Sequence, residues 1–164
     1  MKFTESQKLN ILWVKWLLIV ILIGFIILFI YTIIRKTPYG SLIIGSGIIL
    51  IAVILLLITK ATLRTVYSDE KISYQFSPFS LHYKEINIKE IKSIYLKTID
   101  PVGEFGGYGF RVKRNTKAYI LSSKTIYIVL QNDKTIVLSI SDTIKIKEYV
   151  NYVLSKNLNI TSQP

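Results

Sequence analysis

The hydrophobic pattern of this chain changes abruptly at about residue 60. Before that point, residues 16–34 and 42–58 form two apolar runs that contain no charged side chain. A helix rises ~1.5 Å per residue and a hydrocarbon core is ~30 Å thick, so each run is close to the length that crosses a bilayer. The pattern predicts two transmembrane helices, at about residues 16–34 and 40–59.

Two other interpretations of the runs fit their length less well. A signal peptide has an apolar region of about 7 to 15 residues that ends at small residues, whereas the first run is longer and ends at Arg35 and Lys36. Buried strands of a soluble core are usually about 4 to 8 residues long. The link 35–41 carries Pro38 and Gly40, so we expect a tight turn and an antiparallel helical hairpin.

Small residues interrupt the second run at Gly45, Ser46 and Gly47. They would let this helix approach the first closely, opposite Gly24. Alternatively, they face lipid and have no packing role. The sequence leaves both interpretations open.

The charges beside the runs predict the orientation. An even number of crossings places both termini on one side, and the side richer in lysine and arginine is usually the cytoplasm. The turn carries only Arg35 and Lys36, whereas the side of the termini carries Lys2, Lys8, Lys15, Lys60, Arg64 and Lys71. We expect a multi-pass protein of the cell membrane (inner or plasma membrane) with both termini in the cytoplasm.

From residue 62 onward apolar residues recur at every second position, and turn residues follow every eight to twelve residues. This spacing is typical of an all-β sandwich or barrel. Residues 87–91 would form a single helical turn or a connection, residues 100–109 a loop, and the last two strands a hairpin. The expected strands cover residues 62–67, 72–76, 80–86, 93–99, 110–113, 118–121, 125–131 and 135–140.

A C-terminal helix is expected to close one open end of the sandwich. Ser141 and Asp142 can cap it, and helical spacing relates Ile146, Tyr149, Val150, Val153 and Leu154. The predicted fold class is an α+β membrane protein, in which a two-helix transmembrane hairpin precedes an all-β sandwich or barrel. The predicted domains are 1–61 for the N-terminal segment and the helices, 62–157 for the β domain and 158–164 for a flexible tail.

Residues 100–111, DPVGEFGGYGFR, resemble the D-P-x-x-x-x-G-G-W-G-I-R signature of bacterial membrane-anchored proteins with a pleckstrin-homology-like (PH-like) domain. The resemblance also includes residues 66–72, 77–79 and 90–94 and extends over most of 62–153. Tyr108 and Phe110 stand where the signature has Trp and Ile. The resemblance implies a PH-like sandwich on the membrane and supplies no catalytic residues.

The chain is basic and has no cysteine. Its 21 lysines and arginines exceed its 10 acidic residues, for a net charge of +11. A basic surface beside a bilayer is attracted to anionic lipid, although solvated basic faces are equally common on membrane proteins. The charge is dispersed and no recognition motif accompanies it, so nucleic acid is not an expected partner. Without cysteine, disulfides, thiolate metal sites and cysteine nucleophiles are excluded.

Glycine is concentrated before the expected strand 110–113, at Gly103, Gly106, Gly107 and Gly109. A phosphate-binding loop would lead into a helix, whereas a strand is expected to follow here. We therefore predict a structural loop that reverses the chain. Phe105 and Tyr108 would pack back onto the sandwich, and a nearby acid or carbonyl would hold Arg111.

The densest basic group follows the glycines and comprises Arg111, Lys113, Arg114 and Lys117. Strand alternation would place Arg111 and Lys113 opposite Phe110 and Val112. The group could bind anionic lipid headgroups or a partner, or it could be a solvated edge that discourages aggregation. In the first case, charge reversal of Lys113 and Arg114 abolishes binding of residues 62–164 to anionic vesicles.

No set of residues in the sequence suggests catalysis, since His82 is the only histidine and the acidic residues are scattered. We predict no enzyme, no catalytic residue, no cofactor and no metal. The expected function is that of a non-catalytic integral membrane protein that presents a PH-like binding or scaffolding domain at the cytoplasmic face. An accessory subunit of a transporter or membrane-enzyme complex is the alternative. The expected partners are the membrane itself, anionic lipid headgroups or a membrane protein, and a homo-oligomer is left open.

Overall fold

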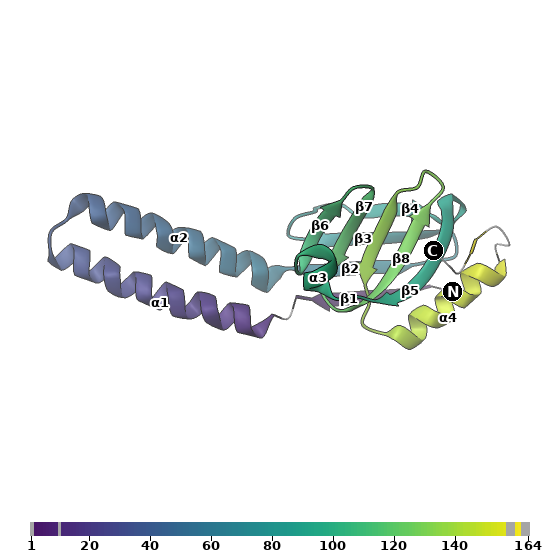
Figure 1. Ribbon diagram of the computed structural model, residues 1–164, viewed down its shortest axis with the longest axis horizontal. Coiled ribbons are helices and arrows are strands. Elements are labelled where there is room, and N and C mark those ends of the chain that lie inside the picture. The colour runs from purple at the N-terminus through teal and green to yellow at the C-terminus, as the bar shows by residue number, and fades with distance from the viewer. Residues whose placement is uncertain (1, 10, 157–159, 162–164) are drawn as a thin grey trace. The chain divides into compact units, whose positions relative to one another are not determined.

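The computed structural model describes residues 2–9, 11–156 and 160–161, and the chain forms two compact units (Figure 1). One unit comprises Asn10–Lys60 and the other comprises Met1–Leu9 together with Ala61–Pro164. The first consists of two apolar helices and the second contains two β-sheets. The chain is therefore α+β, as predicted. The segment Met1–Leu9, which the apolar pattern groups with the helices, belongs to the β unit.

The helical unit consists of α1 (Leu12–Ile34) and α2 (Pro38–Lys60). Both helices are long and apolar enough to cross a membrane, and their most apolar segments are not buried within the protein. The turn between them is shorter than the predicted 35–41 link because Pro38 starts α2, where its fixed φ suits the first helical turn. Lys36 in this turn has a positive φ of 52°.

Glycines of α2 make room for aromatic rings of α1. A Cβ atom on Gly47 would lie 2.6 Å from the ring of Phe25, and one on Gly45 would lie 3.3 Å from the ring of Phe29. Gly24, in contrast, has no such neighbour within 4 Å. Gly45 and Gly47 thus have the predicted packing role, but Phe25 and Phe29 replace Gly24 as their partners.

The β unit contains two sheets, which Figure 1 shows as two layers. The four-stranded sheet has the order β1-β2-β3-β4, with β1 (Phe3–Lys8), β2 (Thr62–Tyr67), β3 (Lys71–Ser77) and β4 (Lys84–Asn87). The five-stranded sheet has the order β5-β8-β9-β7-β6, with β5 (Ile91–Thr98), β6 (Gly109–Lys113), β7 (Thr116–Ile120), β8 (Lys124–Leu130) and β9 (Thr135–Ser139). The described strands form two separate sheets and not one closed barrel.

Most predicted strands are confirmed within a few residues, and β8 and β9 form the predicted hairpin. The short helix η1 (Ile88–Glu90) is the predicted single turn. Two predictions are wrong in part. The strand expected at 80–86 begins only at Lys84, because the side chain of Gln75 holds the preceding loop by donating to the carbonyls of Ser80 and Leu81. The loop expected at 100–109 contains the helix α3 (Pro101–Phe105).

Strand β1 was not predicted, because its inward-facing positions are polar. Glu5 and Gln7 are buried, so the segment lacks the apolar alternation that marks a strand. It pairs with β2 along its whole length, from Phe3 opposite Tyr67 to Lys8 opposite Thr62. The ring of Phe3 also stacks on Tyr67, with ring centres 4.7 Å apart.

The core of the β unit joins both sheets and the C-terminal helix. Tyr74 of β3 meets Tyr119 of β7 with ring centres 5.1 Å apart. The predicted helix is α4 (Thr143–Lys156), which buries Ile146, Tyr149, Val150 and Val153. Leu154 is half-buried.

The predicted flexible tail, 158–164, lies outside the described residues except for Ile160 and Thr161. Ile160 is buried. Thr161 exchanges backbone hydrogen bonds with β5, donating to Lys92 and accepting from Ile94. These two residues are therefore held by the β unit.

Candidate binding surface

Helix α3 begins and ends on residues of the sequence signature. The side chain of Asp100 accepts a hydrogen bond from the Val102 N–H at 3.1 Å, and Pro101 occupies the first turn, where its missing N–H is harmless. The chain leaves the helix at Gly106, which has a φ of 71°. Asp-Pro and the glycines therefore define a short capped helix.

Two of the glycines are required by the backbone. A Cβ atom on Gly103 would lie 2.6 Å from Oδ2 of Asp100, so a side chain there would displace the helix cap. Gly107 has a φ of 127°, which strongly favours glycine. Gly103 and Gly107 therefore serve the local geometry of α3 and of the chain that leaves it.

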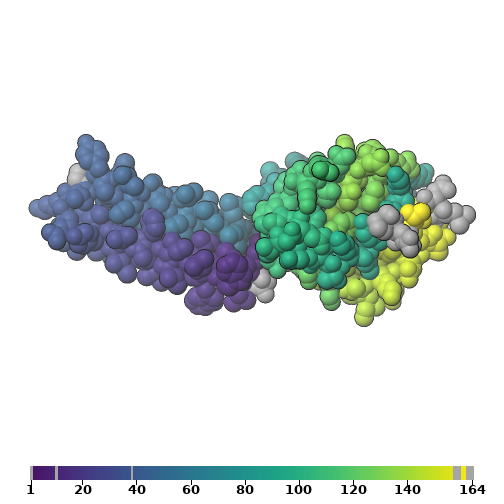
Figure 2. All heavy atoms as spheres, in the orientation of Figure 1, coloured from purple at the N-terminus to yellow at the C-terminus, as the bar shows by residue number. Residues whose placement is uncertain are grey.

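The segment that follows α3 packs onto the five-stranded sheet. Phe105 and Tyr108 lie against a buried cluster composed of Ile99, Ala118, Ile120, Tyr127 and Val137. Arg111 donates to the carbonyl of Phe110 at 3.2 Å. The predicted packing of Phe105 and Tyr108, and the predicted carbonyl partner of Arg111, are therefore confirmed. Figure 2 shows the α3 and β6 segment, in teal to green, at the surface of the β unit.

The four basic residues predicted as a patch do not share one face. They lie on the β6–β7 hairpin, where Arg111 pairs with Ala118 and Val112 pairs with Lys117. Because cross-strand partners project to the same side, Arg111 lies on the face of buried Ala118 and Lys117 lies on the opposite face, beside Val112. Strand alternation places Lys113 on the side of Arg111. The structure therefore groups Arg111 with Lys113 and separates them from Lys117.

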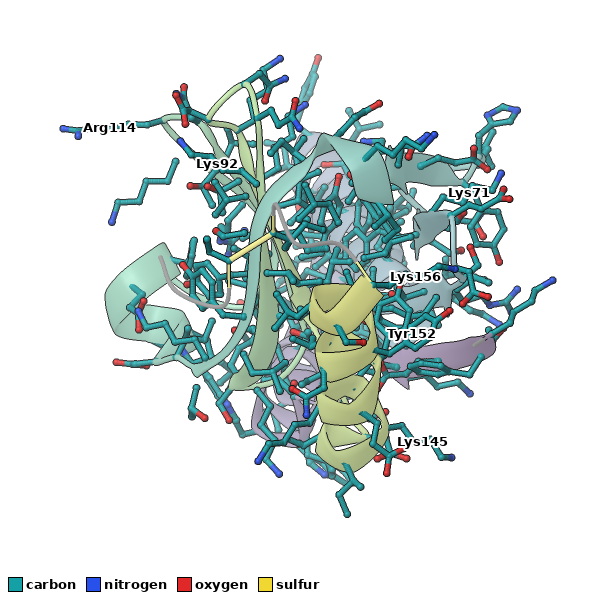
Figure 3. All side chains as sticks on the ribbon, turned by 90° about the vertical axis from the view of Figure 1, so that its right-hand side faces the viewer. Lys71, Lys92, Arg114, Lys145, Tyr152 and Lys156 are labelled. Carbon is teal, nitrogen blue, oxygen red and sulfur yellow. The ribbon has the colours of Figure 1, made fainter. Side chains whose placement is uncertain are left out.

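Arg114 occupies the turn of the hairpin. It has a positive φ of 50°, a conformation that favours glycine over residues with a side chain. Figure 3 shows its side chain extending away from the sheets. Arg114 and Lys117 are exposed, so both can reach an anionic ligand.

Contacts with α3 occupy the other side of the hairpin. The ammonium of Lys113 donates to the carbonyl of Glu104 at 3.3 Å, and the carboxylate of Glu104 pairs with Lys97 at 2.8 Å. Both members of this ion pair are partly exposed, so it contributes at most about 1 kcal/mol. Lys113 is thus partly engaged within the protein.

Two tyrosines lie beneath this surface, the buried Tyr127 and the half-buried Tyr95. Burial raises the pKa of Tyr127 to about 12, and the nearby charges of Glu104 and of the titrating hydroxyl of Tyr95 act in the same direction. Burial also raises the pKa of Tyr95. Both hydroxyls are therefore neutral near pH 7. Over residues 2–9, 11–156 and 160–161, no three His, Asp or Glu side chains gather as ligands for a metal ion.

An exposed apolar patch that the sequence pattern did not predict includes part of the hairpin and part of the β3–β4 loop. We define the apolar patch as Phe79 and Phe110, which line one hollow, together with the exposed residues two positions further along each segment, Leu81 and Val112. The four side chains, in the order Phe79, Leu81, Phe110 and Val112, are 62%, 84%, 41% and 61% exposed. Phe79 and Phe110 line one shallow hollow of about 80 Å³ together with Phe76, Lys84 and Tyr119. Phe79 and Leu81 alternate with polar residues in the sequence, but this pattern alone does not tell which side of the segment faces water.

Glu5 was also missed, because its partners are 136 and 137 residues away in sequence. Its Oε1 accepts hydrogen bonds from the amide and the hydroxyl of Ser141 and, at 3.0 Å, from the amide of Asp142. These groups precede α4, so Glu5 anchors β1 at the start of that helix. Its Oε2 is buried and has no hydrogen-bond partner among the described residues.

The β6–β7 hairpin, together with α3 against one of its faces and the apolar patch that includes Phe110 and Val112, is therefore the candidate binding surface. No protein-family model matches the chain, and no curated protein matches it.

Proposed function

We propose that this protein is a non-catalytic integral membrane protein that presents a PH-like binding or scaffolding domain at the cytoplasmic face of the cell membrane. In this proposal α1 and α2 span the bilayer as a hairpin. The β unit is a PH-like sandwich that α4 closes at one end. Its ligand is an anionic lipid headgroup or a protein at the membrane.

The observation that carries the proposal is the contrast in exposure between the two units. No residue of α1 is buried, although the helix is almost entirely apolar. Such a surface is stable in a hydrocarbon solvent and unstable in water. The β unit, in contrast, buries its own apolar core. A chain with these two units can be anchored by one and can bind with the other.

The orientation can be tested with single cysteines, because the chain has none of its own. Arg114→Cys places a thiol on the exposed hairpin turn of the β unit, and Lys36→Cys places one in the turn between the helices. A membrane-impermeant maleimide applied to intact cells should label residue 36 and should label residue 114 only after lysis. Labelling of residue 114 in intact cells would contradict the cytoplasmic placement.

Ligand binding by the hairpin should be tested on the full chain. The fragment 62–164 lacks β1, and with it Glu5 and the pairing of β1 with β2. The variant Lys113→Glu/Arg114→Glu, in nanodiscs that contain phosphatidylglycerol, should retain fewer anionic lipids in native mass spectrometry than the wild type. Lys89→Glu/Lys147→Glu changes the same charge at exposed sites elsewhere and should retain as many. Equal lipid retention by both variants would exclude the hairpin as a headgroup site.

A separate experiment distinguishes a binding module from an accessory subunit. A subunit of a transporter or membrane enzyme requires an integral-membrane partner in fixed stoichiometry. Purification in a mild detergent, followed by mass spectrometry, should recover the chain without such a partner if it acts as a binding module. Recovery of one integral-membrane protein in constant ratio would favour the subunit.

A further inference from the structure

The apolar patch exposes large side chains that the core of the β unit does not use. Leu81 is 84% exposed and Phe79 is 62% exposed, although Phe79 also stacks on Phe76 with ring centres 5.3 Å apart. Contiguous apolar surface that remains exposed on a soluble domain is typical of an interaction site. The place of the patch in the β unit indicates which surface it contacts.

The patch adjoins the end of the four-stranded sheet where β1 ends and β2 begins. At that end Thr62 pairs with Lys8 on one side and with Ser77 on the other. Phe79 follows Ser77 by two residues, and Phe110 shares the hollow of Phe79. The apolar patch and the two chain connections therefore lie at the same end of the sheet.

Those two connections lead directly into the apolar helices. Ala61 alone separates α2 from β2, and residues 9–11 separate β1 from α1. The amide of Leu9 donates to the carbonyl of Ala61 at 3.0 Å, so the connections leave the β unit together. An extended chain spans at most about 3.6 Å per residue, which places this end of the sheet within a few residues' reach of the helices. If the helices span a bilayer, the headgroups are the nearest large surface.

The borders of the patch carry charges of the sign that a bilayer attracts. Lys117 lies opposite Val112 on the hairpin, and Lys84 donates to the hydroxyl of Tyr119 in the hollow at 3.1 Å. Surfaces that lie in the membrane interface combine apolar side chains, which enter the acyl boundary, with lysines that meet anionic headgroups. The apolar patch and its lysines have this composition.

We propose that the apolar patch inserts into the interfacial region of the bilayer to which the two helices anchor the chain. Phe79 and Leu81 enter the boundary between headgroups and acyl chains, and Lys84 and Lys117 contact anionic headgroups. The β unit then rests on the membrane in one orientation. This inference rests on the proposed membrane anchoring.

Fluorescent labels on the full chain test the proposal. The variants Leu81→Cys and Val112→Cys place an environment-sensitive nitrobenzoxadiazole label in the patch. Both native side chains are exposed, so the label should leave the fold unchanged. Ile144→Cys is the matched control, since Ile144 on α4 is 74% exposed. Leu50→Cys, on α2, reports whether the helices lie in lipid. Each protein is placed in nanodiscs of phosphatidylcholine and phosphatidylglycerol, with and without lipids that carry a doxyl quencher.

We expect blue-shifted emission and doxyl quenching at residues 81 and 112, and neither effect at residue 144. Quenching at residue 50 but not at residues 81 and 112 would overturn the inference and leave the membrane anchor intact. Absence of quenching at residue 50 would overturn the anchor as well. Blue-shifted but unquenched emission at residue 81 would show that protein covers the patch, which also contradicts insertion into lipid.

Discussion

The two units of this chain place their apolar residues in opposite ways. In the helical unit, large apolar side chains such as Val20 and Leu50 are more than half exposed. In the β unit, residues of the same type, such as Leu138 and Ile128, are fully buried. Protein interiors are close-packed, so the β unit has a defined core, whereas the helical unit depends on the medium around it.

This difference indicates where the specificity of each unit resides. In the helical unit, glycines of α2 allow close contact with aromatic rings of α1, as between Gly47 and Phe25. Helices in lipid gain no hydrophobic energy by association, so if α1 and α2 span a bilayer, as proposed, such close packing decides how they pair. The β unit instead relies on burial and on polar contacts over long sequence distances, as between Glu5 and Ser141. The same substitution should therefore have different effects in the two units.

Truncation of a leucine should show the largest contrast. Leu138→Ala removes a fully buried side chain and should destabilise the β unit by about 2–5 kcal/mol, because a cavity is left in the core. Leu50→Ala removes a side chain that is 61% exposed and should leave the β unit unchanged. Hydrogen exchange of β-unit peptides in detergent, read by mass spectrometry, measures both effects. Equal protection in the two variants would contradict the division into units.

Overpacking of the helix contact should have the next largest effect. In Gly47→Leu the new side chain collides with the ring of Phe25, and such overpacking destabilises by about 1–3 kcal/mol. Gly24→Leu is the matched control, since a Cβ atom there meets nothing within 4 Å. Unfolding in mixed micelles with increasing dodecyl sulfate can be followed by the fluorescence of Trp13 and Trp16 on α1. The same midpoint for both variants would exclude the Gly47 contact as a source of stability.

Removal of the Glu5 carboxylate should have a smaller effect. Glu5→Ala leaves the amides of Ser141 and Asp142 without their acceptor, and loss of a helix cap of this kind costs about 0.5–2 kcal/mol. Faster hydrogen exchange is expected in β1 and in the first turn of α4. Ser6→Ala alters the exposed face of the same strand and serves as the control. If exchange in α4 is unchanged, Glu5 does not link β1 to that helix.

The sequence predicted those elements whose side chains follow a regular apolar period. The two apolar runs, the strand Thr62–Tyr67 and the face of α4 with Ile146 and Tyr149 are examples. It failed where polar residues take inward positions, as Glu5 and Gln7 do in β1. It also failed at α3, because five residues are too few to establish a helical period.

The basic patch shows a second limit of sequence patterns. Spacing along one strand correctly separated Arg111 from Phe110, but it could not relate Lys117 to Val112 before the hairpin register was known. The apolar patch escaped prediction for a similar reason. Exposure of Phe79 depends on which segments cover it, and that is a property of the tertiary structure.

The substitution Tyr127→Phe should have the smallest effect, because its effect on the pH dependence appears only in alkaline solution and only in the β unit. Because the folded state raises the pKa of Tyr127 from 10.0 to about 12, it favours the protonated hydroxyl. The stabilisation from this group is complete below pH 10.0 and is lost as the pH rises through about 12. Burial raises the pKa of Tyr67, Tyr74 and Tyr149 in the same direction, so their losses add to it. Tyr127→Phe removes one titrating hydroxyl, so the stability of the variant should fall less steeply above pH 10.0 than that of the wild type. The difference in thermal midpoint between the two proteins at pH 7 is subtracted from the difference at each higher pH. Parallel curves of thermal midpoint against pH would show that deprotonation of Tyr127 does not contribute to alkaline unfolding.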